Sequence, residues 1–245
     1  MRHRAQENGD RLHIYSEKTT RRMTMLNDTT VFSEEELRPL TDTACTVIGV
    51  YLTLTAIGAL FGNIVCLATC KKSQKFSRKL HAHLITHLAI AGIALTASGH
   101  VMFTVSAFAG TWVFGDYGCV LAAFLCYFFA LVCSNIHVAI SVYRYIEVCK
   151  PHLRYFLDPR QSPGIRCFAL AASWLYALFW TSLPLFGWSK YTYESFGVSC
   201  SLNWESRDLI DVTYIYSSFF FSFAIHIIVI VFCYIKRNVA FPSKC

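Results

Sequence analysis

Two cysteines lie at or beyond the end of an apolar stretch, where their thiols could form a disulfide. The chain contains eleven cysteines, and most of them lie within long apolar stretches, where cysteine behaves as a small apolar residue. Cys119 lies at the start of one stretch, and Cys200 lies in the polar loop after the next. On the oxidising side of a membrane these thiols could form a disulfide that ties the loop across the helices. Cys45 lies near the same side, so position alone leaves the pairing open, and two free thiols are the alternative.

Several ionisable side chains lie within or near the apolar stretches, where such residues invite a functional interpretation. They include the histidines His83, His87, His100 and His137. Their spacing matches no set of metal ligands, so we predict neutral, hydrogen-bonded imidazoles and no metal site. Arg144 follows the third stretch, where an arginine can extend to the anionic inner surface of a membrane.

Five uncharged stretches must position these residues, and each is long enough to cross a membrane. The chain has 245 residues, of which 55% are hydrophobic and only 15% charged, whereas a soluble domain carries about a quarter charged residues. A membrane-spanning helix needs about 20 apolar residues, and unpaired backbone groups in lipid exclude irregular structure. The sequence therefore predicts an all-α membrane protein. The stretches are Thr43–Cys70, Leu80–Gly115, Tyr117–Tyr143, Cys167–Ser189 and Val212–Ile235.

The stretches divide the chain into a tail at 1–42, a five-span membrane domain at 43–236 and a short tail at 237–245. Pro184 and Gly187 are expected to end the fourth span. The spans are expected near 43–70, 80–108, 117–143, 164–187 and 212–235.

Loop charges predict which side of the membrane each loop faces, because short loops rich in lysine and arginine stay in the cytoplasm. The loops after spans one and three carry five such residues each. The loop after span two carries none, and the loop after span four carries only Lys190 and Arg207. We therefore expect a multi-pass protein of the plasma membrane with the N-terminus outside and the C-terminus in the cytoplasm. This topology accounts for the net charge of +7, so membrane lipids and not nucleic acid are the expected partners.

The N-terminal tail carries seven lysines and arginines, which argues against an outside location. Most of them lie farther than about 15–20 residues from the first span, where the charge rule loses force. A start at Met23 or Met25 would remove most of these charges. With the tail outside, the sequence Asn27-Asp28-Thr29 is a glycosylation sequon.

The order of several short motifs resembles the rhodopsin-like class of seven-helix receptors. Two longer segments, Trp180–Trp188 and Phe196–Trp204, narrow the resemblance to opsins, especially the peropsin and neuropsin-like groups. The implied fold is the first five helices of a seven-transmembrane bundle. The motifs are Gly62-Asn63, Leu88-Ala89-Ile90-Ala91, Trp112 before Cys119, Tyr143-Arg144-Tyr145, Trp174 and Tyr234.

The resemblance implies a cofactor, a disulfide and a counter-ion. Opsins hold retinal as a Schiff base on a lysine of the seventh helix, and a buried protonated Schiff base needs an anion nearby. The resemblance implies a disulfide between Cys119 and Cys200. It also implies that Glu194, six residues before Cys200, is the counter-ion, although a loop carboxylate taken by itself is more often solvated. The other opsin position for this carboxylate is occupied by Ala122.

The family also has an Asp-Arg-Tyr motif whose arginine gates coupling to a heterotrimeric G protein. Tyr143, Arg144 and Tyr145 occupy this motif, and they are the candidate coupling residues. Because Tyr143 replaces the aspartate that restrains the arginine, the resting state is expected to be held less tightly.

Two further departures from the family concern helix packing. Gly92 stands where most members have an aspartate, so Asn63 loses its usual partner and is expected to serve helix packing, as are the landmarks Trp174 and Tyr234. His226 stands where a proline is typical, so the helix distortion at that point is expected to be absent.

Helices six and seven of the family are missing from this sequence, which continues for ten residues after Ile235. None of its nine lysines lies inside a span, so the chain as written should provide no covalent attachment for retinal. A truncated gene model or an alternative exon is the expected origin. A G protein is then a partner only of a chain completed by these two helices.

The sequence leaves three candidate functions. The first is an opsin-like photoreceptor that is incomplete as written. The second is a retinal photoisomerase, an enzyme only in a full-length form, which Tyr143 and Gly92 favour mildly. The third is a five-span isoform that modulates full-length receptors by joining them in an oligomer. Channels and transporters are disfavoured, because the sequence shows no inverted repeat and no ring of intramembrane charges.

Overall fold

The computed structural model describes residues 40–72, 80–153 and 163–240. Within these ranges, five helical segments are long and apolar enough to cross a membrane, namely Asp42–Lys72, His81–Ala109, Gly115–Cys149, Cys167–Phe186 and Leu209–Ala240. They confirm the five predicted spans, and the third begins two residues earlier and ends six residues later than expected. Asn27 and nearly all of the predicted outer tail lie outside the described residues.

The spans, together with the loop between the fourth and fifth spans, are built from the following elements in chain order. They are α2 (Asp42–Lys72), α4 (Leu80–Leu95), η1 (Thr96–His100), α5 (Val101–Ala109), α6 (Gly115–Cys149), α7 (Pro163–Ser182), η3 (Leu183–Phe186), β1 (Tyr191–Tyr193), β2 (Cys200–Leu202), α8 (Leu209–Phe219), η4 (Phe220–Ala224) and α9 (Ile225–Ala240).

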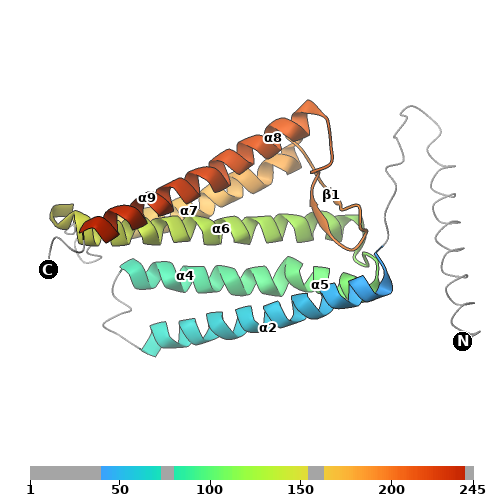
Figure 1. The fold of residues 1–245 in the computed structure, drawn as a ribbon, viewed down its shortest axis with the longest axis horizontal. Helices are drawn as coiled ribbons and strands as arrows, with labels where there is room; N and C mark the ends of the chain where they lie inside the picture. The colour runs from blue at the N-terminus through green and yellow to red at the C-terminus, as the bar shows by residue number, and fades with distance from the viewer. Residues whose placement is uncertain (1–39, 73–79, 154–162, 241–245) are drawn as a thin grey trace, which may run out of the picture. The chain divides into compact units, whose positions relative to one another are not determined.

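Helix α6 is the centre of the bundle. It packs against α4, α7 and α9 and also touches both strands, and Figure 1 shows it between α4 on one side and α7 with α9 on the other. The middle of α6 is accordingly buried, with Val132 and Ile136 fully enclosed. Residues on this helix therefore face most of the other elements.

The second span bends at η1, a π-helical segment between α4 and α5. Ser98 leaves the helical conformation there, with φ −104° and ψ −110°, and its hydroxyl donates to the carbonyl of Ala94 at 2.6 Å. π-helical segments and side chains that insert into the backbone ladder are known causes of helix kinks. The bend allows the backbone at Gly99 to approach the carbonyl of Ala122 on α6.

The fifth span is also distorted, and the expectation of an undistorted helix at His226 is wrong. A π-helical segment, η4, separates α8 from α9 immediately before His226. The hydroxyl of Tyr176 on α7 donates to the carbonyl of Phe221 within η4 at 2.9 Å. Because a backbone carbonyl in a membrane needs a partner, this hydrogen bond stabilises the irregular turn without a proline.

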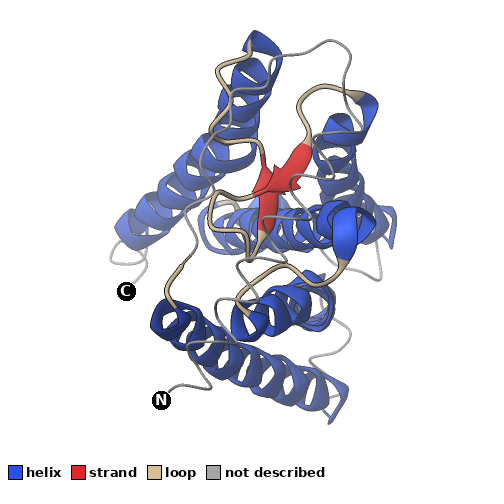
Figure 2. Ribbon diagram, turned by 90° about the vertical axis from the view of Figure 1, so that its right-hand side faces the viewer, coloured by secondary structure: helices blue, strands red, loops and turns tan. Residues whose placement is uncertain are grey.

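A short hairpin crosses the end of the bundle between the fourth and fifth spans. Strands β1 and β2 are antiparallel, with Tyr191 opposite Leu202 and Tyr193 opposite Cys200. Figure 2 looks onto this end and shows the two strands over the middle of the helices. The fourth span ends as predicted, since η3 contains Pro184 and Gly187 follows in the left-handed conformation with φ 95°.

Candidate functional site

A disulfide ties the hairpin to the outer end of α6. Cys119 and Cys200 are bonded, their Cα atoms lie 5.4 Å apart, and both side chains are almost fully buried. The pairing that the opsin resemblance implied is confirmed. Cys45, the alternative partner, is a buried free cysteine.

Beneath the hairpin lies a cavity of about 750 Å³. Its walls come from α2, α5, α6, the hairpin loop, α8 and η4, and most of its lining side chains are apolar or aromatic. Cavities of this size bind small molecules in other proteins. The lining includes Ile48, Leu52, Phe103, Ala107, Ala123, Tyr127, Leu131, Tyr191, Val198, Phe219 and Phe223.

Glu194, the predicted counter-ion, lies in the turn between β1 and β2 and lines this cavity. Its backbone is fixed by two hydrogen bonds, from its own N–H to Ser199 O at 3.0 Å and from Gly197 N–H to its carbonyl at 2.8 Å. The hydroxyl of Ser199 donates to its carboxylate. The side chain is half-buried, so a carboxylate is held at the cavity wall.

Tyr191 connects the floor of the hairpin to the fourth span. Its hydroxyl donates to the carbonyl of Thr181 at 2.8 Å, and its ring meets that of Phe124 edge to face at 6.4 Å. Burial raises the pKa of the Tyr191 phenol, so it remains a neutral donor. This hydrogen bond fixes the position of the hairpin relative to the fourth span.

The inner part of the cavity is lined by hydroxyl groups that sequence reasoning did not identify. They belong to Ser134 on α6 and to Ser218 and Ser222 on the fifth span. Ser134 is paired with His226 through a contact of 2.9 Å between Oγ and Nδ1. The four-residue spacing of Ser218, Ser222 and His226 was the available signal, because such residues share one helix face.

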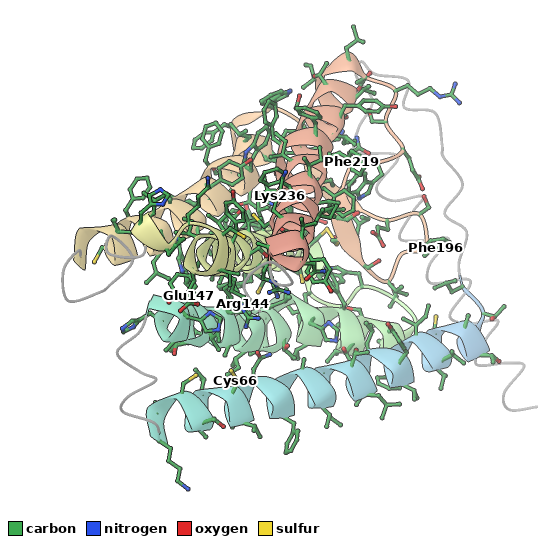
Figure 3. All side chains as sticks on the ribbon, turned by 60° about the vertical axis from the view of Figure 1, so that its left-hand side comes forward. Cys66, Arg144, Glu147, Phe196, Phe219 and Lys236 are labelled. Atoms are coloured by element: carbon green, nitrogen blue, oxygen red, sulfur yellow. A yellow bond between two sulfur atoms is a disulfide. The ribbon has the colours of Figure 1, made fainter. Side chains whose placement is uncertain are left out.

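The predicted coupling residues lie at the opposite end of α6. Nη2 of Arg144 is 3.3 Å from Nε2 of His81 on α4, and the ring of His81 stacks on that of Tyr143 at 5.7 Å. Together with Glu147 and Arg237 they line a recess of about 550 Å³. Figure 3 labels Arg144 and Glu147 near this end of α6, beside α4. Tyr145 faces a different neighbour, Phe232 on α9, at 5.9 Å.

Two of the three landmark residues, Asn63 and Trp174, lie at contacts between helices. Asn63 donates to the carbonyl of Ala59 at 2.8 Å, and its side chain fills the space beside Gly92, where an added Cβ would lie 2.6 Å from Nδ2. Trp174 meets the rings of Phe128 and Phe129 at 5.9 and 6.4 Å. Tyr234 is exposed, and its ring lies 5.1 Å from the guanidinium of Arg237 on the same helix, α9, so its packing role stays a prediction.

Two of the intramembrane histidines contact backbone carbonyls. His100 Nε2 lies 2.9 Å from Leu52 O, and His137 Nδ1 lies 2.7 Å from Cys133 O. Among the described residues, no group of three or more histidine, cysteine or acidic side chains could hold a metal ion. The contact of His100 joins the bent second span to the first.

These features define a multi-pass membrane protein with a cavity under a disulfide-tied hairpin. The family model described as "7 transmembrane receptor (rhodopsin family)" matches residues 62–240. The chain belongs to this family.

Its relatives among characterised proteins are opsins. It is 32% identical over 188 residues to a protein named "Rhodopsin, G0-coupled" from Mizuhopecten yessoensis, covering 77% of this chain and 46% of the relative. It is 33% identical over 192 residues to human Opsin-5, covering 78% and 53%. It is 26% identical over 207 residues to the human visual pigment-like receptor peropsin, covering 84% and 58%. The chain thus spans about half the length of the curated relatives it matches.

The crystal structure of squid rhodopsin has the same arrangement of helices. It aligns with a TM-score of 0.76 over 88% of this chain and 62% of that chain, at 22% sequence identity. At this identity the likeness supports the fold alone.

Proposed function

We propose that this chain provides the retinal-binding cavity and the coupling face of an opsin-type photoreceptor in the plasma membrane. The observation that carries the proposal is the position of Glu194, a half-buried carboxylate on the wall of a mostly apolar cavity. A carboxylate at such a wall is unfavourable when no opposite charge faces it, and a ligand that carries a positive charge would pair with it.

The lining of the cavity fits the apolar body of retinal. Phe103, Leu131 and Phe219 are among the side chains that would contact the polyene and its ring, and residues of the hairpin line the cavity as well. Retinal supplies light-driven isomerisation of a double bond when it is bound. Glu194 would balance the positive charge of a retinal–lysine linkage, and the Ser199 hydroxyl that donates to Glu194 would orient it.

Among the described residues, no lysine that could form such a linkage lines the cavity. The described lysines are Lys71, Lys72, Lys150, Lys190 and Lys236, and none of them lines the cavity. We therefore propose that this chain binds retinoids without a covalent bond, and that a longer form with two more helices supplies the amine. Sequencing the transcript past the codon for Ile235 tests the second part: an open reading frame with a lysine in the last helix is the expected result.

The recess around Arg144 would meet a heterotrimeric G protein in the completed receptor, with the N-terminus outside the cell. Retinal photoisomerisation is the second candidate, because Tyr143 replaces the usual acid and Arg144 contacts His81 instead. Illumination of the full-length protein separates the two functions. Activation of a G protein supports the receptor, whereas release of isomerised retinal without activation supports the photoisomerase.

Retinoid binding to the chain itself tests the cavity directly. We would place the 245-residue chain in lipid nanodiscs and compare retinol with the cationic retinylamine by tryptophan quenching, since Trp204 lines the cavity. Retinylamine should bind at least about tenfold more tightly, because hydrogen bonds between charged groups contribute more than neutral ones.

The matched variants are Glu194→Gln and Glu205→Gln. Glu194→Gln should bring the affinity for retinylamine down to that for retinol. Glu205 accepts a hydrogen bond from Ser195 in the same loop but is absent from the cavity lining, so Glu205→Gln should retain the preference. Absence of any retinoid binding by the wild-type chain would refute the proposed function.

A further inference from the structure

A groove of about 670 Å³ lies between α7 and α9, with α6 as its floor. None of the described residues lines both this groove and the cavity under the hairpin. Its lining is mostly apolar, and Phe168 on its α7 wall is 74% exposed, so the groove opens onto the lipid. The apolar lining includes Val142, Ile146, Phe168, Ala172 and Ile225.

The groove is closed at the end nearer the hairpin. The hydroxyl of Tyr176 on α7 donates to the carbonyl of Phe221 in η4 at 2.9 Å, and Asn135 on α6 donates to the carbonyl of Ser173 on α7 at 2.8 Å. From Asn135 the lining of α6 extends eleven residues to Ile146, which at 1.5 Å per residue is about 16 Å. One leaflet contributes a similar length, about 15 Å, to the hydrocarbon core, so the groove fits one acyl chain.

Two basic side chains lie at the open, inner end of the groove, away from the hairpin. Lys150 follows Ile146 by four residues at the end of α6, and Lys236 follows Ile225 by eleven residues, or about three turns, on α9. Each lysine therefore continues the helix face that lines the groove. The thiol of Cys149 donates to the carbonyl of Lys236 at 3.6 Å, which brings the ends of the two helices together. Both lysines are exposed.

We propose that this groove binds an anionic phospholipid of the inner leaflet, with one acyl chain in the groove and the headgroup at Lys150 and Lys236. Basic residues beside a membrane attract anionic headgroups, and an apolar groove left unfilled loses dispersion contacts. A zwitterionic lipid could supply the chain but not the net negative charge. The inference goes beyond the proposed function, since it needs neither retinoid nor light.

The test counts the lipids that stay on the chain. The 245-residue chain is placed in nanodiscs of equal parts phosphatidylserine and phosphatidylcholine, released into detergent and weighed by native mass spectrometry. The wild-type chain should retain one phosphatidylserine with a preference of about tenfold, because the groove holds the chain and the lysines select the charge. The double variant Lys150→Gln, Lys236→Gln should lose this preference.

The matched control removes the same charge from another helix. Lys71 and Lys72 end α2 and are also exposed, but they are absent from the groove lining. The double variant Lys71→Gln, Lys72→Gln should retain the bound phosphatidylserine. Equal losses in the two double variants would mean that surface charge alone attracts the lipid, and would overturn the site.

A second pair of variants tests the groove while all charges are kept. Ala172 lines the groove, so Ala172→Phe should displace the acyl chain and abolish retention. Ala171 is its exposed neighbour on α7 and is absent from the lining, so Ala171→Phe should have no effect. Circular dichroism of each variant checks that the helices are intact.

Three results would overturn the proposal. The first is equal retention of the two phospholipids by the wild-type chain, and the second is retention that survives Ala172→Phe. The third is displacement of the bound phosphatidylserine by cholesterol added to the nanodiscs, which would assign the groove to a sterol. Retinoid binding is measured separately, so each of these results leaves the proposed function standing.

Discussion

Gly99 shows how a single residue sets the distance between two spans. A Cβ added at this position would lie 2.5 Å from the carbonyl oxygen of Ala122 and 2.5 Å from Sγ of Cys126. The first of these atoms belongs to the backbone of α6 and cannot rotate away. Glycine is therefore required where the bent second span touches the central helix, as small residues are at other close helix contacts in membranes.

We predict that Gly99→Ala destabilises the bundle by about 1–3 kcal/mol, the cost of inserting one methyl group into a close-packed contact. Thermal unfolding in a fixed detergent is the measurement. Gly58→Ala is the control, since a Cβ at Gly58 meets nothing within 4 Å and alanine favours the helix. Equal melting temperatures for the two variants would show that the backbone of α6 at Ala122 can move away from the added methyl group.

The features predicted correctly from the sequence depend on local composition, whereas the missed contacts depend on which helices meet in the fold. The spans follow from the absence of charge over about 20 consecutive residues, a local property. The contact between Ser134 and His226 and the contact between Arg144 and His81 depend on which faces of two helices meet. The π-helical segments η1 and η4 change those faces, and neither has a proline to mark it.

Glu194 is an intermediate case. Its six-residue distance from Cys200 indicated a role only through the family resemblance, because a loop carboxylate has no local signal for burial. The structure places it on the cavity wall, since the turn between β1 and β2 is closed by backbone hydrogen bonds. Its role as a counter-ion stays a prediction that the retinylamine experiment tests.

Among the elements, the hairpin is the one whose position depends on a covalent bond. The disulfide closes a sequence separation of 81 residues, and backbone contacts such as Trp112 N–H to Gly197 O at 2.8 Å add to it. For a random coil, a loop of this length corresponds to about 4–5 kcal/mol. The spans remain inserted in lipid when the bond is absent, so this value is an upper limit.

We predict that Cys200→Ser loosens the hairpin and leaves the helices intact. The variant should be cleaved faster by protease between β1 and β2 and should bind retinoids more weakly, with an unchanged helical circular dichroism spectrum. Cys167→Ser is the control, because Cys167 is an exposed free cysteine on α7. Unchanged proteolysis of Cys200→Ser would mean that hydrogen bonds such as that of Tyr191 suffice to hold the hairpin.

For the whole molecule, two independent properties are consistent with one proposed orientation in the membrane. The disulfide at the hairpin end requires an oxidising compartment. The basic side chains in the last turns of α2 and α9, among them Lys71, Lys72 and Arg237, lie at the other end, as expected for the cytoplasmic side. We therefore propose that the hairpin faces the outside of the cell, because a disulfide and few basic residues are both expected on that side.

We predict from this orientation that Asn27 is glycosylated and that the N-terminus is exposed on intact cells. Removal of glycans by a glycosidase should speed the electrophoretic migration of the wild-type protein and leave Asn27→Gln unaffected. An N-terminal epitope should be labelled by antibody without permeabilisation, and a C-terminal epitope only after it. Because the tail carries seven basic residues, the opposite labelling pattern is the competing outcome. It would put the cysteines in a reducing compartment, and the Cys119–Cys200 disulfide would then have to be absent from the cellular protein.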